Sequence, residues 1–228
     1  MLKRNDVKHI LQETLEPVLT PNGFRARGDC FVRSIADGNQ PISIALYDYR
    51  PTFEFSASLG IRLEEVEKFV STFTGVLPEH RSLTLTSLTQ LEHFGLKVEG
   101  GRGVLFRGDS HDTLCQAASR LADVLRLHAV PFLDRYRDLP SVEAGLNPPG
   151  AEGISSPIWP EDHSRFDGTN EPYRAMHGIA TAYLVGNPKT LSLIHAYRGQ
   201  LSGMVEEIRS KYESLAKHIE ALTKSAKV

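Results

Sequence analysis

The chain has 228 residues, of which 40% are hydrophobic and 24% are charged, a composition typical of globular proteins rather than disordered or fibrous chains. Its formal net charge of −2 shows no excess of lysine and arginine, so composition argues against a nucleic-acid partner. No apolar run approaches the roughly 20 residues that span a bilayer. Charged and polar residues interrupt the N-terminus, so we expect no signal peptide there.

The two cysteines also bear on the compartment of the protein. Cys30 and Cys115 lie far apart and form no CxxC pair. Such spacing fits buried thiols in a reducing compartment better than a disulfide framework. We therefore expect a cytoplasmic protein without a membrane anchor.

A helix is predicted at the start of the chain, from about Asp6 to Leu19, because apolar residues recur there at helical spacing. Pro17 should kink or end this helix, since proline has no amide hydrogen and clashes one turn back. Asn22–Gly23 then marks a turn.

The next segment predicts β-structure. Cys30–Ile35 is followed by Asp37–Gly38–Asn39, which is a strong hairpin signal. Residues 42–47 and 53–59 then alternate apolar and polar side chains with a period of two. This alternation is typical of strands in a sheet with one buried face.

Helical spacing returns from Glu64 to Phe73, and Gly75 and Pro78 should end that helix. We expect a strand over 83–86. Two more strands, over 96–99 and 104–107, should form a hairpin around Gly100–Gly101.

A further helix should follow, with Asp109 or Ser110 as its cap and an apolar stripe reaching His128. Pro131 is expected to bend this helix. From 139 to 170 prolines and glycines dominate, which predicts a linker or a surface excursion. The expected organisation is thus an α+β body over 1–138, a linker over 139–170 and a helical hairpin over 171–228.

The C-terminal segment predicts two helices. The first begins at Asn170–Glu171–Pro172 and ends at Gly186, and a second, long helix should run from Pro188 to Lys224. Apolar residues on the second helix are spaced alternately four and three apart, which predicts a coiled-coil seam. Either the rest of the chain or a second copy would cover this seam, and we expect a homodimer through it. The seam residues are Leu201, Val205, Ile208, Tyr212, Leu215, Ile219 and Leu222.

No motif in the chain identifies a catalytic, cofactor-binding or metal-binding residue. Gly100–Gly103 lies between two expected strands, so a hairpin turn is favoured over a phosphate-binding loop. His111–Asp112 fits a helix cap better than a catalytic pair. His177 and His195 lie on the two C-terminal helices and could face one another, but surface or boundary positions are favoured.

The proline-rich segment also contains one cluster of acidic residues and a histidine. Glu161, Asp162, His163 and Asp167 lie beside Trp159, the single tryptophan. Such oxygen and imidazole groups could bind a divalent metal, although an exposed acidic loop is favoured because no spacing matches a defined site. Trp159 could contact a partner or cover the parent domain.

Part of the chain resembles a family of uncharacterised bacterial α+β domains whose members occur among immunity proteins of interbacterial toxin systems. The resemblance covers about residues 10–137. It implies a binding module, one that could block a toxin's active site, and it supplies no catalytic residues. It is carried by Leu15–Glu16–Pro17, Gly23–Phe24–Arg25, Phe31, Ile42–Ile44, Phe53–Glu54–Phe55 and Leu59–Gly60.

These observations predict an α+β fold, with a mainly antiparallel sheet carrying packed helices, followed by a helical hairpin with a long last helix. The leading interpretation is a non-enzymatic protein-binding module without a cofactor, whose partner could be a toxin. One alternative is a hydrolase or metal-dependent enzyme using Asp162, His163 and Asp167, and another is an oligomeric adaptor. The expected partner-binding residues are Trp159, Glu161, Asp162, Ile208, Tyr212 and Leu215.

Overall fold

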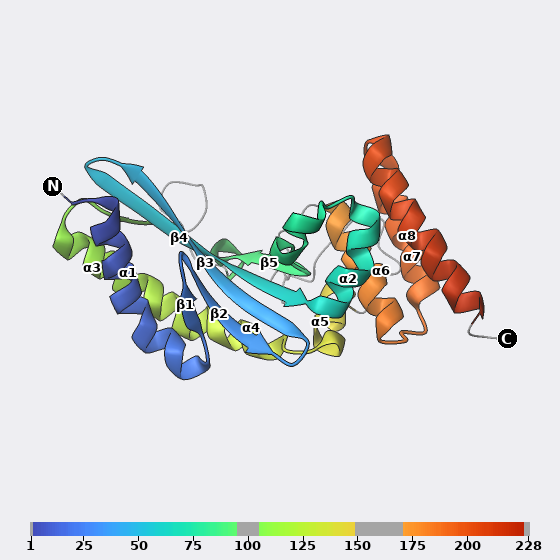
Figure 1. Ribbon diagram of the computed structural model, residues 1–228, viewed down its shortest axis with the longest axis horizontal. Coiled ribbons are helices and arrows are strands. Elements are labelled where there is room, and N and C mark those ends of the chain that lie inside the picture. Colours follow the sequence, from blue (N-terminus) through green and yellow to red (C-terminus); the bar gives the residue numbers. More distant parts are fainter. Residues whose placement is uncertain (1, 95–104, 149–170, 226–228) are drawn as a thin grey trace. The chain divides into compact units, whose positions relative to one another are not determined.

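The computed structural model describes residues 2–94, 105–148 and 171–225, which form two compact units (Figure 1). The first unit contains Met1–Ile61 and Leu88–Arg135, and the second contains Arg62–Ser87 and Tyr136–Val228. The predicted α+β class is confirmed, because helices pack on an antiparallel sheet and further helices follow at the C-terminus. Among the described residues, no helix combines the length and apolar character needed to cross a bilayer.

The sheet is built mainly in the first unit. Its strands follow the order β1-β2-β3-β4-β5, and β6 also pairs with β4. The β1–β2, β2–β3 and β4–β6 pairs are antiparallel. The strands are β1 (Arg25–Arg27), β2 (Cys30–Ile35), β3 (Gly38–Tyr49), β4 (Thr52–Leu63), β5 (Ser87–Gln90) and β6 (Phe106–Gly108).

The core of the first unit follows from the alternation in these strands. Phe53, Phe55, Ala57 and Leu59 of β4 are buried, whereas the residues between them are half-buried. The described residues of this unit include three α-helices, and α1 packs against α3 (Figure 1). They are α1 (Arg4–Leu19), α3 (His111–Val124) and α4 (Val130–Arg135). The predicted one-sided burial is therefore confirmed.

Several predicted details of the first 100 residues are corrected. Helix α1 continues through Pro17 and ends at Leu19, so the proline lies within the last turn of the helix rather than after it. Residues 83–86 form no strand, because a 3₁₀ helix over Pro78–Leu83 precedes β5. The expected strand over 96–99 and the hairpin at Gly100–Gly101 lie outside the described residues.

The start of α3 matches the expectation. Ser110 caps it by accepting a hydrogen bond from the amide of Thr113. Its end differs, because a π-helical turn over Leu125–Ala129 leads directly into α4, and Pro131 lies in the first turn of α4. The three segments form one continuous helical stretch, and the irregular π-helical turn directly precedes the part that contains the proline, which lacks the amide hydrogen of a regular helix.

A buried polar network ties β2 and β3 to α4. Arg33 lies over the Phe24 ring, 4.6 Å from its centroid, and donates to Gln40 and, at 2.7 Å, to Asp134. Gln40 in turn donates to the carbonyl of Leu133 at 2.8 Å. Because each buried polar group has a partner, the guanidinium is accommodated at low cost.

The second unit is helical, and α6 lies at its centre in contact with α2, α5, α7 and α8. Helix α2 ends at Gly75, whose φ of 72° favours glycine, as its position predicted. The helices are α2 (Glu64–Thr74), α5 (Leu139–Leu146), α6 (Glu171–Leu184), α7 (Thr190–Gln200) and α8 (Glu206–Ser225).

This division differs from the expected body over 1–138, linker over 139–170 and hairpin over 171–228. Helix α2, expected in the body, packs against α6 and α8. The start of the expected linker is helical, because Asp138 caps α5 by accepting from the Ser141 amide. Pro140 lies in the first turn of α5 and therefore does not break it.

The expected long helix from Pro188 to Lys224 is interrupted. A 3₁₀ turn over Leu201–Gly203 and the extended Met204 separate α7 from α8. Gly199 and Gly203 lie close to the break and favour it, since glycine costs conformational entropy in a helix. The expected hairpin is therefore a group of three helices.

Candidate binding site

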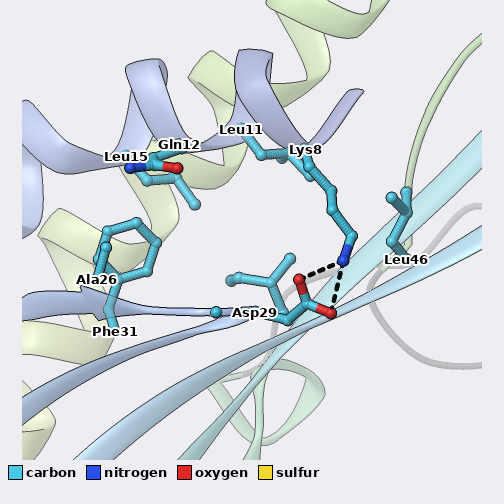
Figure 2. Close-up of a pocket in the computed structure, with 10 residues that line it drawn as sticks. Lys8, Leu11, Gln12, Leu15, Ala26, Asp29, Phe31 and Leu46 are labelled. Atoms are coloured by element: carbon cyan, nitrogen blue, oxygen red, sulfur yellow. Dashed lines mark hydrogen bonds and ion pairs between the residues drawn. The ribbon is translucent and has the colours of Figure 1, made fainter. Parts of the chain in front are cut away.

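A pocket of about 270 Å³ lies between α1 and the sheet of the first unit. Figure 2 shows side chains of α1 on one side and residues of the strands on the other. We call it the α1 pocket. It is lined by Lys8, Leu11, Gln12, Leu15, Ala26, Gly28, Asp29, Phe31, Ile44 and Leu46.

The walls of the α1 pocket follow from two periodicities. Leu11 and Leu15 are one helical turn apart, so they share the face of α1 that points to the sheet. Ile44 and Leu46 are two residues apart in β3, so they project from the same face of the strand. Both strand residues are half-buried, which leaves apolar surface open at the pocket.

A single ion pair lies at one side of the pocket. Lys8 Nζ is 2.6 Å from Oδ1 and 2.9 Å from Oδ2 of Asp29, as Figure 2 shows. Asp29 belongs to the β1–β2 turn, which Gly28 makes possible with a φ of 61°. Both side chains are partly exposed, so the pair contributes little stability, about 0–1 kcal/mol.

The chemistry of the α1 pocket is suited to binding. Its titratable lining groups are Lys8 and Asp29, which are paired with one another. No serine, cysteine or histidine lines it, so it offers no nucleophile beside a base. Its volume is below the usual range of about 300–1,000 Å³ for small-molecule sites. It therefore fits one or two side chains of a larger partner.

Two exposed tyrosines lie on β3 next to the pocket residues. Tyr47 and Tyr49 are 43% and 62% exposed, and their stacked rings have centroids 6.3 Å apart. Asp48, between them, is held by Arg50 through bonds of 3.2 Å. Tyrosine is enriched at binding hot spots because it buries a large area with few rotatable bonds. Because Tyr47 and Tyr49 alternate with Ile44 and Leu46 along β3, the tyrosine rings project from the face of the sheet opposite to the α1 pocket.

The second unit contains a different polar cluster around Glu67, which is buried. Glu67 Oε1 lies 3.2 Å from His177 Nε2 and accepts a hydrogen bond of 2.8 Å from the Thr86 hydroxyl. Burial alone would raise the pKa of Glu67. Hydrogen bonds from His177 and from nearby threonines, together with the charge of His177, instead lower this pKa to about 2. The carboxylate is therefore ionised at neutral pH.

Arg62 completes this buried cluster. Its guanidinium lies 4.0 Å from Glu67, pairs with Glu64 at 2.7 Å and donates to the carbonyls of Arg81 and Thr84. The Thr86 hydroxyl also accepts a hydrogen bond from the Leu63 amide, so it acts as both donor and acceptor. The hydrogen bonds of Thr86 and the ion pairs of Arg62 thus hold the Glu67 carboxylate in place. We interpret the cluster as structural.

Beside this cluster lies an open hollow of about 730 Å³ in the second unit. Cations and carboxylates alternate around it, so it has no net preference for one sign of ligand charge. The lining residues are Arg62, Glu64, Glu65, Glu67, Lys68, Ser71, Thr72 and Arg81. Within the described parts of the chain, no group of three or more potential metal ligands is found.

The predicted partner-binding residues on the last helix prove to be mostly internal. Tyr212 and Leu215 are fully buried in the second unit, and the Tyr212 hydroxyl donates to the carbonyl of Ile194. Ile208 is half-buried. Val205, expected in the same seam, is 65% exposed. The middle of the seam is thus covered within the chain, and a homodimer through it stays a prediction.

The predicted residues of the proline-rich segment lie outside the described residues; they are Trp159, Glu161, Asp162, His163 and Asp167. His195 is exposed, as expected.

Two further expectations concern histidines. His177 was expected at the surface, but it is buried against Glu67. His111 and Asp112 are exposed in the first turn of α3, and Ser110 rather than either of them is the cap.

The α1 pocket itself was missed by sequence reasoning. Its residues come from α1, the β1–β2 turn and β3, and no local pattern joins these three segments. One usable signal was present: the six-residue strand at Cys30–Ile35 is too short to pair with the whole of the alternating segment that follows it.

The family resemblance of residues 10–137 receives no independent support. Comparisons with protein-family models, with curated proteins and with solved structures find no match to this chain.

Proposed function

We propose that the protein is a non-enzymatic binding module that holds another protein at the α1 pocket and along the adjoining end of β3. One observation carries this proposal: the end of β3 forms one wall of an open apolar pocket, on the scale of one or two side chains, and carries two exposed tyrosines on its other face. Exposed aromatic side chains and apolar pockets are both features of interface cores.

The partner class follows from the same features. Leu11, Ile44 and Leu46 offer apolar contact, whereas Lys8 and Asp29 already satisfy one another. The partner should therefore present an apolar side chain rather than a strongly charged group. The resemblance stated above makes a bacterial toxin the first partner to test.

A quantitative capture experiment tests the proposal. The full chain is immobilised and exposed to extract of the organism that encodes it, in parallel with Leu46→Asp and with Val205→Asp. The first change places a carboxylate in the α1 pocket. The second places one at an exposed helix start, where aspartate is favoured.

We expect a partner retained by the wild type and by Val205→Asp, and lost with Leu46→Asp at an unchanged melting temperature. Equal retention by all three chains would place the interface elsewhere.

A further inference from the structure

The outer half of β3, residues 44–49, has no strand beside it on one side. β2 pairs with β3 only from Gly38 to Ser43. The amide of Ile44 then donates to the carbonyl of Asp29 at 3.0 Å, and at this point the chain turns at Gly28 into β1. Figure 1 shows the β3–β4 hairpin continuing past the β1–β2 turn. Among the described residues, no other strand occupies the position beside 46–49.

The direction of the backbone groups in this segment follows from antiparallel geometry. In a strand of an antiparallel sheet, the amide and carbonyl of one residue point to the same side, and the side alternates. Because the Ile44 amide points toward β2, the amides and carbonyls of Leu46 and Asp48 point the same way, toward the open edge. Those of Ala45 and Tyr47 point toward β4. Leu46 and Asp48 therefore present two donors and two acceptors at this edge.

The open edge adjoins the α1 pocket. The side chains of Ile44 and Leu46 line the pocket, opposite Leu11 and Leu15 of α1. A strand added beside Leu46 would share this face of the sheet, so every second side chain on it would point toward α1. The pocket has room for such a side chain. On the opposite face, the intervening side chains would lie beside Tyr47 and Tyr49.

We infer that an extended segment of the partner protein adds to the sheet as a strand beside Leu46 and Asp48, with an apolar side chain in the α1 pocket. This inference rests on the proposed binding function and names its mode. Backbone hydrogen bonds supply affinity in such strand addition, and the pocket supplies specificity. An open edge is suited to such a partner, since unpaired backbone groups readily recruit another strand.

A second copy of the chain fits this edge less well. Ile44 is already bonded to Asp29, so an antiparallel copy can pair only beyond it. The residue placed opposite Leu46 would then be Asp48 or Arg50. Either would bring a charged side chain against the apolar wall of the pocket, which is unfavourable. A partner segment with alternating apolar residues has no such cost.

The test uses linear 12-residue peptides selected from a random phage-displayed library on the immobilised full chain. The best binder is synthesised with a fluorophore, and its Kd is measured by anisotropy. We compare the wild type with Asp48→Pro, which removes one edge amide, and Asp48→Ala, which removes the carboxylate but keeps the amide. Proline is tolerated on edge strands, so the fold should persist.

We expect selected peptides with apolar residues at alternate positions. Asp48→Pro should weaken binding about tenfold, and Asp48→Ala should not. A second measurement changes the peptide instead of the protein. When single backbone amides of the peptide are N-methylated, the affinity for the wild-type chain should fall at every second position and stay unchanged at the positions between.

The outcomes separate the two claims. Binding that Leu46→Asp abolishes, but that neither Asp48→Pro nor N-methylation changes, overturns strand addition and leaves the pocket function standing. Failure to select any linear peptide also overturns strand addition. A dimeric free chain that Asp48→Pro makes monomeric would show that a second copy occupies the edge, against the inference. Binding unaffected by Leu46→Asp would contradict the proposed function itself.

Discussion

At the scale of single residues, the least predictable feature was the Glu67–His177 pair. Each residue lies on a helix that the sequence predicted, but their contact depends on how α2 and α6 pack. Helical spacing specifies which face of each helix is buried and not which residues meet across that face. His177 therefore looked like a surface residue. Gly75 is the contrasting case, because its role at the end of α2 depends only on local backbone conformation.

The buried Glu67 predicts acid sensitivity of the second unit. Its pKa is lowered to about 2 from an ordinary 4.5, so the folded state favours the carboxylate. The resulting stability is fully present above pH 4.5 and is lost as the pH falls toward 2. The shift corresponds to about 3 kcal/mol. Urea unfolding between pH 7 and 2.5 should show the free energy of unfolding falling by an amount of this order.

Glu67→Gln should remove this acid-dependent loss and should already be less stable at pH 7, because it leaves the buried His177 without its carboxylate. Glu65→Gln, a change at an exposed neighbour, is the matched control. An unchanged pH profile in Glu67→Gln would show that the buried carboxylate contributes nothing to folding.

At the scale of elements, local patterns were reliable where one residue type determines the backbone. The strands from Cys30 to Leu59 were predicted because a period of two identifies a half-buried strand wherever its partners lie. Helix α5 was missed because Pro140 was interpreted as a breaker, although it lies in a capped first turn. The single C-terminal helix was overextended, because the seam pattern continues across the break at Leu201–Gly203.

The close approach of α6 to its neighbours predicts a strong effect of one methyl group. A Cβ at Gly178 would lie 2.9 Å from Asn147 Oδ1 and 3.0 Å from the Tyr197 hydroxyl. These two groups are hydrogen-bonded at 2.9 Å, so neither can move freely. Gly178→Ala should lower the free energy of unfolding by about 1–3 kcal/mol.

The control for this change is Gly199→Ala in α7, where a Cβ would meet nothing within 4 Å. That variant should be neutral or more stable by about 0.5–1 kcal/mol, because alanine loses less entropy in a helix. Thermal unfolding of the two variants measures both changes in stability. Equal effects would mean that α6 is packed less closely than the structure shows.

The buried middle of α8 also changes the meaning of the dimer test. Ile208→Glu with Leu215→Glu would be expected to separate a dimer if the seam joined two copies. Because Leu215 is fully buried within the chain, the structure instead predicts that this double variant unfolds the second unit. Circular dichroism and sedimentation distinguish the two cases. A folded, monomeric variant of a dimeric wild type would support the homodimer.

At the scale of the whole molecule, the structure revises how the chain is divided. The second unit contains residues from two separate parts of the sequence, since Arg62–Ser87 belongs with Tyr136–Val228. Sequence reasoning divides a chain at composition changes, and this discontinuity has no such signature. The α+β class was nevertheless predictable, because it depends on which elements exist rather than on how they are grouped.

A chain truncated after Arg137 tests this grouping. Val66 and Val70 of α2 are buried, and α6 and α8, with which α2 packs, would be missing. We predict that α2 amides lose protection from hydrogen exchange, while amides of β2 and β3 remain protected. Full protection of α2 in the truncated chain would restore the expected continuous body over 1–138.

The central claim is that another protein binds at the α1 pocket, and site-specific photocrosslinking tests it most directly. A photoreactive benzoylphenylalanine replaces Gln12, an exposed residue that lines the pocket, or Ser214, an exposed residue of α8, in the organism that encodes the chain. The account predicts a discrete protein adduct from position 12, absent from position 214 and lost with Leu46→Asp. The same adducts from both positions, or an adduct at position 12 that persists with Leu46→Asp, would contradict it.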